Sequence, residues 1–406
     1  MTFIRDNQFR KRSKVKLGDI ASVLAGYAFP SNAMKTDSGQ YQLVKMSNLY
    51  KGKLDLNRNP SFIDELEDRH KKFLLRKGDI LITLTGTLGK RDFGYTALVE
   101  SDSDLLLNQR VCAIRPTPGL AISDYLIGLL RDKIFLDQFF DLSIGGTGNQ
   151  ANVSINALKD ILISLPAVDE QIEVAKLANI WQLAADKMEQ LIAAKERHYS
   201  HELSRLIGRG QHPHAHVGVF AEEVSARNRG GNEARVLSVT NSRGFVLPED
   251  QFERRVASAD LSNYKVVHRG QYAYNPSRIN VGSIARLDGW DDGVLSPMYV
   301  VFRLDEDKAN SDYFLHWLNS HEARQRIKNS AQGSVRETVS FSELAAITIP
   351  LPARHTQTAI ARYLNALREE IDLLSQSVAA LKTQKRGLMQ KLLTGQWRLP
   401  VQEEAN

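Results

Sequence analysis

Some features are scarce in this 406-residue sequence, and their scarcity excludes whole classes of protein. Cys112 is the only cysteine, so neither an intrachain disulfide nor a zinc site built on several thiolates can form. No apolar run approaches the roughly 20 residues that a transmembrane helix needs. The start of the chain is polar and basic, unlike a secretory signal peptide. We therefore expect a soluble protein of the reducing cytoplasm.

The sequence also lacks a large excess of charge of one sign: it has 53 Lys and Arg residues and 47 Asp and Glu residues, which gives a formal net charge of +6. This modest excess permits a polyanionic partner such as DNA without demonstrating one. At this length the chain can bury the cores of two or more domains.

A duplicated stretch organises the sequence. Residues Pro166 to Leu206 recur 186 positions later as Pro352 to Leu392. In each copy a β-branched apolar run is typical of a buried strand, and a Leu-Pro step ends it because proline has no N–H to donate. Each strand is followed by a long expected helix, to about Gly208 in the first copy. A repeat of this length indicates two halves of one design.

Both expected helices carry apolar residues at alternating spacings of three and four, which is typical of a coiled-coil seam. The seam residues are Val174, Ala178, Trp181, Ala185, Met188, Ile192, Tyr199 and Leu206 in the first copy and Ile360, Leu364, Leu367, Ile371, Leu374, Val378, Leu381, Leu388 and Leu392 in the second. Lys195, Glu202 and Lys385 interrupt the pattern. The simplest partner of each helix is the other copy, and antiparallel pairing would place one globule at each end.

We therefore predict an α/β (mixed α+β) fold, with two pseudo-twofold-related globular domains separated by two long antiparallel coiled-coil helices. The expected boundaries are a basic arm at 1–16, a first globule at 17–165, a first helix at 166–208, a linker at 209–216, a second globule at 217–351, a second helix at 352–394 and a tail at 395–406.

Within the first globule, short apolar runs predict strands at 41–46, 80–84, 96–99 and 111–114, followed by a helix at 123–140. The second globule repeats this plan with different loop lengths, since the offset drifts from about 200 near its start to 186 at the helix. Duplicated frames that carry different loops are typical of a protein that recognises two different things.

Two polar segments have ordinary explanations. The basic arm, with Arg5, Arg10, Lys11, Arg12, Lys14 and Lys16, could contact phosphates, but we expect a solvated tail. His212, His214 and His216 alternate as metal ligands can, yet no cysteine or acidic ligand is near them. A solvated linker and no metal are therefore expected.

Two matching loops are candidates for ligand contact. The first, 83–91, lacks the spacing of a P-loop, but its threonines, glycines and terminal Lys90-Arg91 can bind phosphates or base edges. The second, 275–283, has Arg and Asn side chains that can contact guanine and adenine. Asn275-Pro276 only partly matches an adenine methyltransferase tetrapeptide. No nuclease carboxylate cluster is present, and the glycine-rich residues 144–150 are expected to form a turn.

The strand, Leu-Pro and helix unit, the ending Gln390 to Leu399 and the loop Tyr274 to Arg278 resemble the specificity subunit of type I restriction-modification systems over nearly the whole chain. The second copy departs from the family's pattern by having Thr356 where the first has Glu170. The resemblance implies two target recognition domains, each reading half of a split, asymmetric DNA site, with a helix pair that sets the spacer. It also implies two methyltransferase subunits and translocase-nuclease subunits as partners.

The resemblance further implies no catalysis and no cofactor in this subunit, with S-adenosylmethionine, ATP and Mg²⁺ used by its partners. An orphan DNA-binding module and a coiled-coil protein-interaction protein remain alternatives. From loop position and side-chain type, the expected DNA-binding residues are Lys45, Ser47, Asn48, Thr85, Thr87, Lys90, Arg91 and Arg110 in the first domain and Thr240, Asn241, Arg243, Asn275, Ser277, Arg278, Asn280 and Ser283 in the second.

Overall fold

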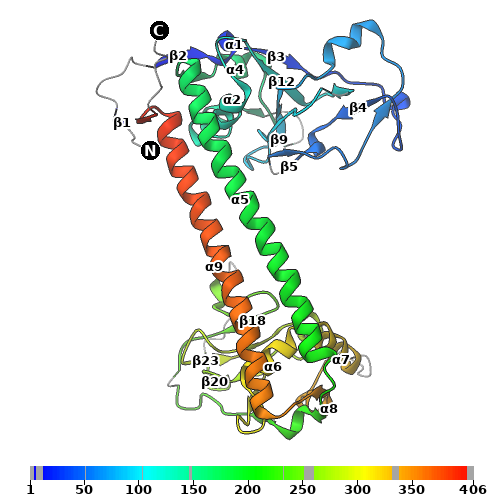
Figure 1. Ribbon diagram of the computed structural model, residues 1–406, viewed down its shortest axis with the longest axis vertical. Coiled ribbons are helices and arrows are strands. Elements are labelled where there is room, and N and C mark those ends of the chain that lie inside the picture. Colours follow the sequence, from blue (N-terminus) through cyan, green and yellow to red (C-terminus); the bar gives the residue numbers. More distant parts are fainter. Residues whose placement is uncertain are drawn as a thin grey trace. The chain divides into compact units, whose positions relative to one another are not determined.

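The computed structural model describes residues 4–5, 12–50, 52–102, 104–145, 149–231, 233–250, 260–331 and 338–399. The chain forms two compact units: unit 1 is Met1–Lys187 with Val378–Asn406, and unit 2 is Met188–Ser377. Two long helices, α5 (Val168–Leu203) and α9 (Arg354–Leu393), contribute residues to both units (Figure 1). The expected mixed α/β fold, with two globular units and a pair of long helices, is confirmed.

The centre of unit 1 is an antiparallel sheet of four strands in the order β10 (Thr96–Leu98), β8 (Ile80–Thr83), β12 (Val111–Pro116) and β3 (Ala21–Ala25). Alternating side chains supply two cores. One face packs against helices α2 (Ser123–Leu130) and α3 (Lys133–Asp141), and the other packs against a three-stranded sheet of β11 (Leu105–Leu107), β4 (Tyr41–Val44) and β7 (Phe62–Ile63). The sheet is therefore the middle layer of the unit.

The predicted strands of the first globule begin at the expected residues and end within two residues of the expected positions. The single helix predicted at 123–140 is wrong, because the chain forms α2 and α3 instead. Asp132 separates them: its Oδ1 accepts a hydrogen bond of 2.9 Å from Ile134 N and caps the second helix.

Unit 2 repeats the topology of unit 1. Its four-stranded sheet has the order β22 (Ile284–Arg286), β21 (Tyr272–Tyr274), β24 (Val300–Leu304) and β17 (Ala221–Val224), and each strand occupies the place of its counterpart in unit 1. Helices α6 (Ser311–Leu318) and α7 (His321–Ala331) correspond to α2 and α3. The aromatic residues of this sheet, including Tyr272 and Phe302, pack against Phe314 of α6.

Shorter elements complete both units. Unit 1 also contains β2 (Ser13–Lys16) paired with β15 (Leu162–Leu165), α1 (Leu17–Ile20), α4 (Ile155–Asp160), β5 (Leu49–Tyr50) paired with β6 (Lys53–Leu54), the sheet of β13 (Ile144–Gly145), β14 (Gln150–Asn152) and β9 (Thr85–Thr87), and β1 (Ile4–Arg5) paired with β26 (Trp397–Arg398). Unit 2 also contains β16 (His214–His216) paired with β25 (Thr348–Pro350), α8 (Phe341–Ala346), β18 (Ser238–Thr240) paired with β19 (Gly244–Val246), and β20 (Lys265–His268) paired with β23 (Asp292–Leu295).

A buried glutamine attaches each globule to its long helix. Gln171 accepts a hydrogen bond from Ile122 N at 3.1 Å and donates to the carbonyls of Leu120 and Pro166. The repeat residue, Gln357, accepts from the backbone N–H of residue 310 at 2.7 Å and donates to the carbonyls of residues 308 and 352. Both side chains are at most 1% exposed. The glutamine of the repeat is therefore a structural residue that satisfies backbone groups beside the helix start.

The seam residues predicted for α5 and α9 are buried or half-buried in both units. In unit 1 the beginning of α5, with Val174 and Trp181, packs in the same core as Leu388 and Leu392 near the end of α9. In unit 2 the opposite ends of the helices meet: Leu203 near the end of α5 shares a core with residues 360–364 near the start of α9. The two helices therefore run antiparallel within each unit, as predicted.

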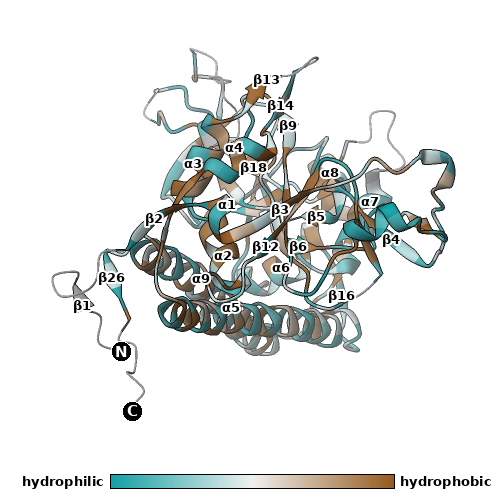
Figure 2. Cartoon of the chain, turned by 90° about the horizontal axis from the view of Figure 1, so that it is seen from above, coloured by the Kyte–Doolittle hydropathy of each residue, from teal (hydrophilic) through white to brown (hydrophobic). Residues whose placement is uncertain are grey.

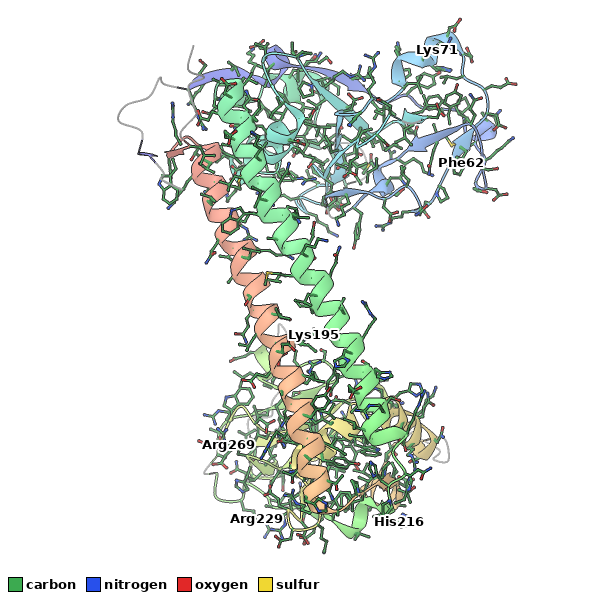
Figure 3. All side chains as sticks on the ribbon, viewed as in Figure 1. Phe62, Lys71, Lys195, His216, Arg229 and Arg269 are labelled. Atoms are coloured by element: carbon green, nitrogen blue, oxygen red, sulfur yellow. The ribbon has the colours of Figure 1, made fainter. Side chains whose placement is uncertain are left out.

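The polar residues that interrupt the seam are paired. In unit 2, Lys195 of α5 forms an ion pair of 2.7 Å with Glu370 of α9 (Figure 3). In unit 1, Lys385 Nζ donates to Gln182 Oε1 at 2.7 Å. Glu202 is buried and pairs with Arg205 on its own helix at 2.6 Å. Polar groups at seam positions favour one register over others, at some cost in stability.

The prediction that the basic arm is a solvated tail is wrong from Arg12 onward. Ser13–Lys16 forms β2, and the buried Arg12 guanidinium pairs with Glu170 and donates to the carbonyls of Leu392 and Leu393 at 2.7 and 3.0 Å. Arg10 and Lys11 lie outside the described residues, as does the side chain of Arg5. The arm therefore caps the last turn of α9 within unit 1.

Part of the histidine segment, which was expected to be a solvated linker, forms a strand, although His214 and His216 are exposed. His214–His216 forms β16 in register with β25, and His216 Nδ1 lies 2.8 Å from the Ala346 carbonyl oxygen. His212 Nε2 lies 2.9 Å from the carbonyl oxygen of Leu206.

None of the described helices combines the length and the apolar character needed to cross a lipid bilayer.

Candidate nucleic-acid interface

In unit 1 the predicted residues gather where the buried strand β8 ends. The chain continues into β9, which pairs with β14, so that Thr87 lies opposite Gln150. Thr85 Oγ1 donates to Met46 Sδ at 3.0 Å. This contact brings the segment around Lys45 and Ser47, both half-buried, beside β9. The structure thus joins two of the predicted segments. Sequence reasoning missed β14 as their neighbour; only its first residue, Gln150, lay in the segment 144–150 that was expected to form a turn.

The turn after β9 is held by Asp92. Its carboxylate accepts hydrogen bonds from Thr87 N at 2.6 Å and Thr87 Oγ1 at 2.7 Å, and these bonds lower the pKa of Asp92 below its ordinary value. A Cβ at Gly86 would lie 2.5 Å from Asp92 Oδ1, so only glycine fits there. The turn presents the exposed side chain of Lys90 to solvent, with no ion pair among the described residues.

The two arginines predicted for the site in unit 1, Arg91 and Arg110, differ in whether they already have an ionic partner. Arg91 forms an ion pair of 2.9 Å with Asp137 and lies over the Phe140 ring. Arg110 is exposed in the turn between β11 and β12, where its φ of 68° places it in the left-handed region. Arg110 is therefore available to bind a ligand. Arg91 would first have to release the carboxylate of Asp137.

Asn48 has a structural role in unit 1. Its side chain is 1% exposed, and its Oδ1 accepts from Lys45 N at 2.8 Å. Its Nδ2 donates to the carbonyls of Asp55 and Arg58 at 2.9 and 2.8 Å. These bonds use both the amide oxygen and the amide nitrogen, so Asn48 shapes the loop that carries Lys45 and Ser47.

In unit 2 the loop 275–283 is fixed to the β18–β19 hairpin. Ser283 is 3% exposed, and its Oγ donates to Val239 O at 2.7 Å. A Cβ at Gly282 would lie 3.9 Å from the Asn241 Cβ, and the φ of 92° at Gly282 requires a glycine-like backbone. The predicted residues of the loop and of the hairpin tip therefore form one surface.

Thr240 and Ser283 stabilise this surface from beneath. Thr240 Oγ1 donates to the Gly244 carbonyl at 3.1 Å and accepts from Arg243 N at 3.0 Å, which closes the hairpin. At the other end of the loop, Asn275 Oδ1 accepts from Ser277 N at 3.0 Å. These bonds belong to the turn chemistry that Ser, Thr and Asn side chains commonly supply.

The outward-facing groups of unit 2 are Asn241, Arg243, Ser277 and Arg278, all exposed, with Asn275 and Asn280 half-buried. Arg278 forms no ion pair among the described residues, and Asn280 Oδ1 is buried there without a hydrogen-bond partner. Among the residues that the structure places, no cluster of His, Cys, Asp or Glu is suited to hold a metal ion. The surface thus offers guanidinium and amide groups, the chemistry that hydrogen-bonds base edges and phosphates.

Comparison with known proteins gives one family. The model of the type I restriction modification DNA specificity domain matches residues 11–190 and 277–383. The putative type I restriction enzyme MjaX specificity subunit of Methanocaldococcus jannaschii is 20% identical over 382 residues, 88% of each chain. The type I restriction enzyme EcoBI specificity subunit of Escherichia coli is 22% identical over 227 residues, 55% of this chain and 44% of the relative.

Two solved structures share the fold. The type I restriction-modification S subunit from M. genitalium has a TM-score of 0.58 at 15% identity, covering 96% of this chain and 97% of that one. A chain from a structure that describes complex assembly and conformational transition of the type I R-M system has a TM-score of 0.60 at 16% identity, covering 97% and 99%. With the family model matched over both halves, the chain belongs to the type I restriction-modification DNA specificity family.

Proposed function

We propose that the chain is the DNA-recognition subunit of a type I restriction-modification complex. Each globular unit would read one half of a bipartite, asymmetric site in duplex DNA. The subunit would perform no catalysis itself. The observation that carries this proposal is the repeated four-stranded frame, which ends in two surfaces with different side chains: threonines and Lys90 in unit 1, and Arg278 with several asparagines in unit 2.

Different surfaces on equivalent frames are what an asymmetric site demands, because each half-site presents its own pattern of donors, acceptors and methyl groups in the major groove. Unpaired cations serve a second purpose. A side chain such as Lys90, exposed and without an ion pair among the described residues, can neutralise a phosphate without first giving up a carboxylate partner.

For the long helices we propose the remaining roles. The antiparallel pair would set the length of unread DNA between the half-sites and would dock two adenine methyltransferase subunits. Translocase-nuclease subunits would join in the full complex. S-adenosylmethionine, ATP and Mg²⁺ would then be bound by those partners.

The decisive experiment maps modified adenines in the genome of cells that carry or lack this gene, with the partner methyltransferase genes present in both. We expect a split motif, two short sequences at a fixed separation, that is modified only when the gene is present. A version with residues 217–351 exchanged for those of a relative should change one half of the motif and leave the other. An unchanged pattern in both comparisons would contradict the proposal.

DNA contact by unit 1 can be tested through salt dependence. Lys90→Ala should weaken binding to all duplexes and reduce the slope of log K against log salt by about one, because one phosphate contact is lost. Lys308→Ala, which removes an exposed lysine paired with Asp305, is the matched control and should leave the slope unchanged. Identical slopes for wild type and Lys90→Ala would remove Lys90 from the interface.

A further inference from the structure

An exposed arginine of unit 1 lies beside the proposed reading surface, although side-chain type and loop position in the sequence did not single it out. Arg58 is in the loop between β6 and β7, and its Cζ lies 4.4 Å from the centre of the Tyr50 ring. Such a cation is attracted by the electron-rich face of the ring. Arg58 forms no ion pair among the described residues. Its guanidinium is therefore oriented by an aromatic ring but not engaged by a carboxylate.

Two hydrogen bonds connect the backbone of Arg58 to the proposed surface. Asn48 Nδ2 donates to the Arg58 carbonyl at 2.8 Å, and Asn48 Oδ1 accepts from Lys45 N at 2.8 Å. A single buried amide therefore bridges the backbones of Arg58 and Lys45. The residue after Lys45, Met46, accepts a hydrogen bond from Thr85 Oγ1. These contacts place Arg58 at the edge of the surface that carries Lys45 and Thr85.

The ring that Arg58 covers is also fixed in place. Tyr50 ends β5, which pairs with β6, and Figure 2 shows the two strands next to each other. Gly52, between these strands, accepts a hydrogen bond of 2.7 Å from Arg131 through its carbonyl. Arg131 also donates to Thr96 Oγ1 of β10 at 2.9 Å. The hairpin that carries Tyr50 is thus attached to the central four-stranded sheet.

The contact with Tyr50 leaves donors of Arg58 available. Guanidinium groups stack on aromatic rings through their face, and their N–H donors lie at the edge of the plane. Among the residues that the structure places, none accepts a hydrogen bond from the Arg58 side chain. A planar fork of this kind matches a ligand with two neighbouring acceptors. In DNA these are O6 and N7 of guanine, or two oxygens of a phosphate.

The fixed orientation of Arg58 favours the base over the phosphate. A phosphate contact needs a positive charge and tolerates a flexible side chain, which exposed lysines such as Lys90 provide. A base edge requires the donors in one plane and at one place. The Asn48 bond to the backbone and the Tyr50 ring beneath the guanidinium supply both conditions.

We propose, resting on the function proposed above, that Arg58 contacts a guanine bidentately in the half-site read by unit 1. Tyr50 is the residue that positions it. In unit 2 the exposed Arg278 would have the corresponding task from a different loop. The two half-sites would then each be read by one arginine that is not engaged in an ion pair.

The test uses the assembled complex and a duplex that carries the mapped split site. Exchange of residues 217–351 identifies the half that unit 1 reads. Each guanine of that half is replaced in turn by 7-deazaguanine, which removes the N7 acceptor and keeps Watson–Crick pairing. We expect one replacement to weaken binding about tenfold, because one hydrogen bond to a charged group is lost. Arg58→Ala and Arg58→Met should bind the guanine and 7-deazaguanine duplexes equally at that position.

Tyr50 variants separate positioning from a structural role. Tyr50→Leu should reduce the preference for guanine over 7-deazaguanine to about threefold, because the guanidinium loses its ring, whereas Tyr50→Phe should keep it. A merely structural role would weaken binding to both duplexes by the same factor. The matched control is Arg69→Ala, which removes an exposed arginine of unit 1 that pairs with Glu67. It should keep the full preference.

Three results would overturn the guanine contact. Arg58→Ala could weaken binding to all duplexes alike, which would indicate a phosphate contact. The preference for guanine could persist in Arg58→Ala, which would assign that base to another residue. The half-site of unit 1 could contain no guanine on either strand.

Site-specific binding that is indifferent to every 7-deazaguanine replacement would also overturn the guanine contact, and it would leave the proposed function intact. Absence of any preference for the mapped site over unrelated duplexes would instead contradict the proposed function. The two failures are therefore distinguishable in one set of titrations.

Discussion

Unit 1 and unit 2 attach the same sheet to the long helices with different chemistry. In unit 1 the Arg12 guanidinium, ion-paired with Glu170, caps the carbonyls at the end of α9. At the equivalent place in unit 2, His212 lies against the Leu206 carbonyl, and Thr356 replaces the carboxylate. The two changes accompany each other, since a buried arginine needs an anionic partner and a histidine does not. The departure at Thr356 therefore reflects pairing within the chain.

The units diverge further at the side of the sheet away from the helices. Both units pair a central strand in parallel on one side and antiparallel on the other, but to different extents. Unit 1 has the parallel ladder β4–β11 and a single antiparallel bridge, Leu74–Leu106, whereas unit 2 has a single parallel bridge, Val236–Val294, and the antiparallel ladder β20–β23. The four-stranded sheets, by contrast, keep the same strand order. The four-stranded frame beside the long helices is thus held constant, while the pairing on its other face varies in extent. This is expected if assembly with partner subunits conserves the frame and the DNA sequence selects the other side.

The largest expected difference between the units comes from their caps. Arg12→Ala leaves the Glu170 carboxylate buried without its partner and should lower the unfolding free energy of unit 1 by about 3–5 kcal/mol. His212→Ala removes one hydrogen bond from unit 2 and should cost about 1 kcal/mol. Urea unfolding of the full chain, followed by hydrogen exchange in each unit, measures both.

The double variant Arg12→His with Glu170→Thr transfers the unit 2 arrangement into unit 1. It should recover most of the stability that Arg12→Ala loses, because no charge is left buried. Equal costs for Arg12→Ala and His212→Ala would show that the ion pair has no special weight.

The glutamine clamps should behave alike in the two units. Gln171→Leu and Gln357→Leu retain similar volume but leave a buried backbone N–H without an acceptor, which costs about 1–3 kcal/mol in each case. Thermal unfolding of each variant beside Gln376→Leu, which changes an exposed residue of α9, provides the measurement. A clear effect in only one unit would show that the clamps are not equivalent.

Arginines on the two proposed reading surfaces should differ in specificity. Arg278→Ala should cost about 1–3 kcal/mol of binding and relax base choice at one position, because an unpaired guanidinium can contact guanine bidentately. Arg91→Ala should have a smaller effect, since Arg91 is already engaged by Asp137 and Phe140. Binding of each variant to a set of single-base variants of the mapped site measures both effects. An unchanged base preference in Arg278→Ala would show that Arg278 does not contribute to base choice.

The smallest expected effect is a difference in acid sensitivity. His316 lies buried in unit 2 between Tyr199 and Asn365, at 2.8 Å from each, whereas the corresponding residue of unit 1 is Gly128. Burial lowers the pKa of His316, so the unfolded chain takes up a proton at higher pH than folded unit 2 does. The stability that neutral His316 contributes is present above pH of about 6.5 and is lost as the pH falls further.

Unit 2 should therefore lose stability before unit 1 as the pH falls below that value. His316→Gln should reduce the pH dependence of unit 2 and leave that of unit 1 unchanged, as read from hydrogen exchange between pH 5 and pH 8. The same slope in both units of the wild type would contradict a role for His316.

Sequence reasoning worked best where structure follows local pattern. The seam from Ile360 to Leu392 is periodic and amphipathic, so it predicted a long helix, and α9 ends at Leu393. The strands β8 and β12 are continuous apolar runs bounded by turn residues and were also predicted. The α2–α3 break was missed because Arg131-Asp132 interrupts an apolar pattern that otherwise continues.

Side-chain type was a weaker guide to the candidate site. Asn48, Thr240 and Ser283 have base-reading chemistry, but each is at most 9% exposed and hydrogen-bonds to backbone carbonyls of its own unit. Burial depends on which distant segments meet, so loop composition could not distinguish these cases.

The sequence by itself determined the repeat and the two long helices, because periodicity of 3.5 residues and an offset of 186 are properties of the chain alone. Only the tertiary structure decided that Arg12 belongs to a core, that His214–His216 is a strand, and which loop residues face outward. The first two depend on partners more than 100 residues away, Glu170 and β25. Local propensity cannot specify such a partner.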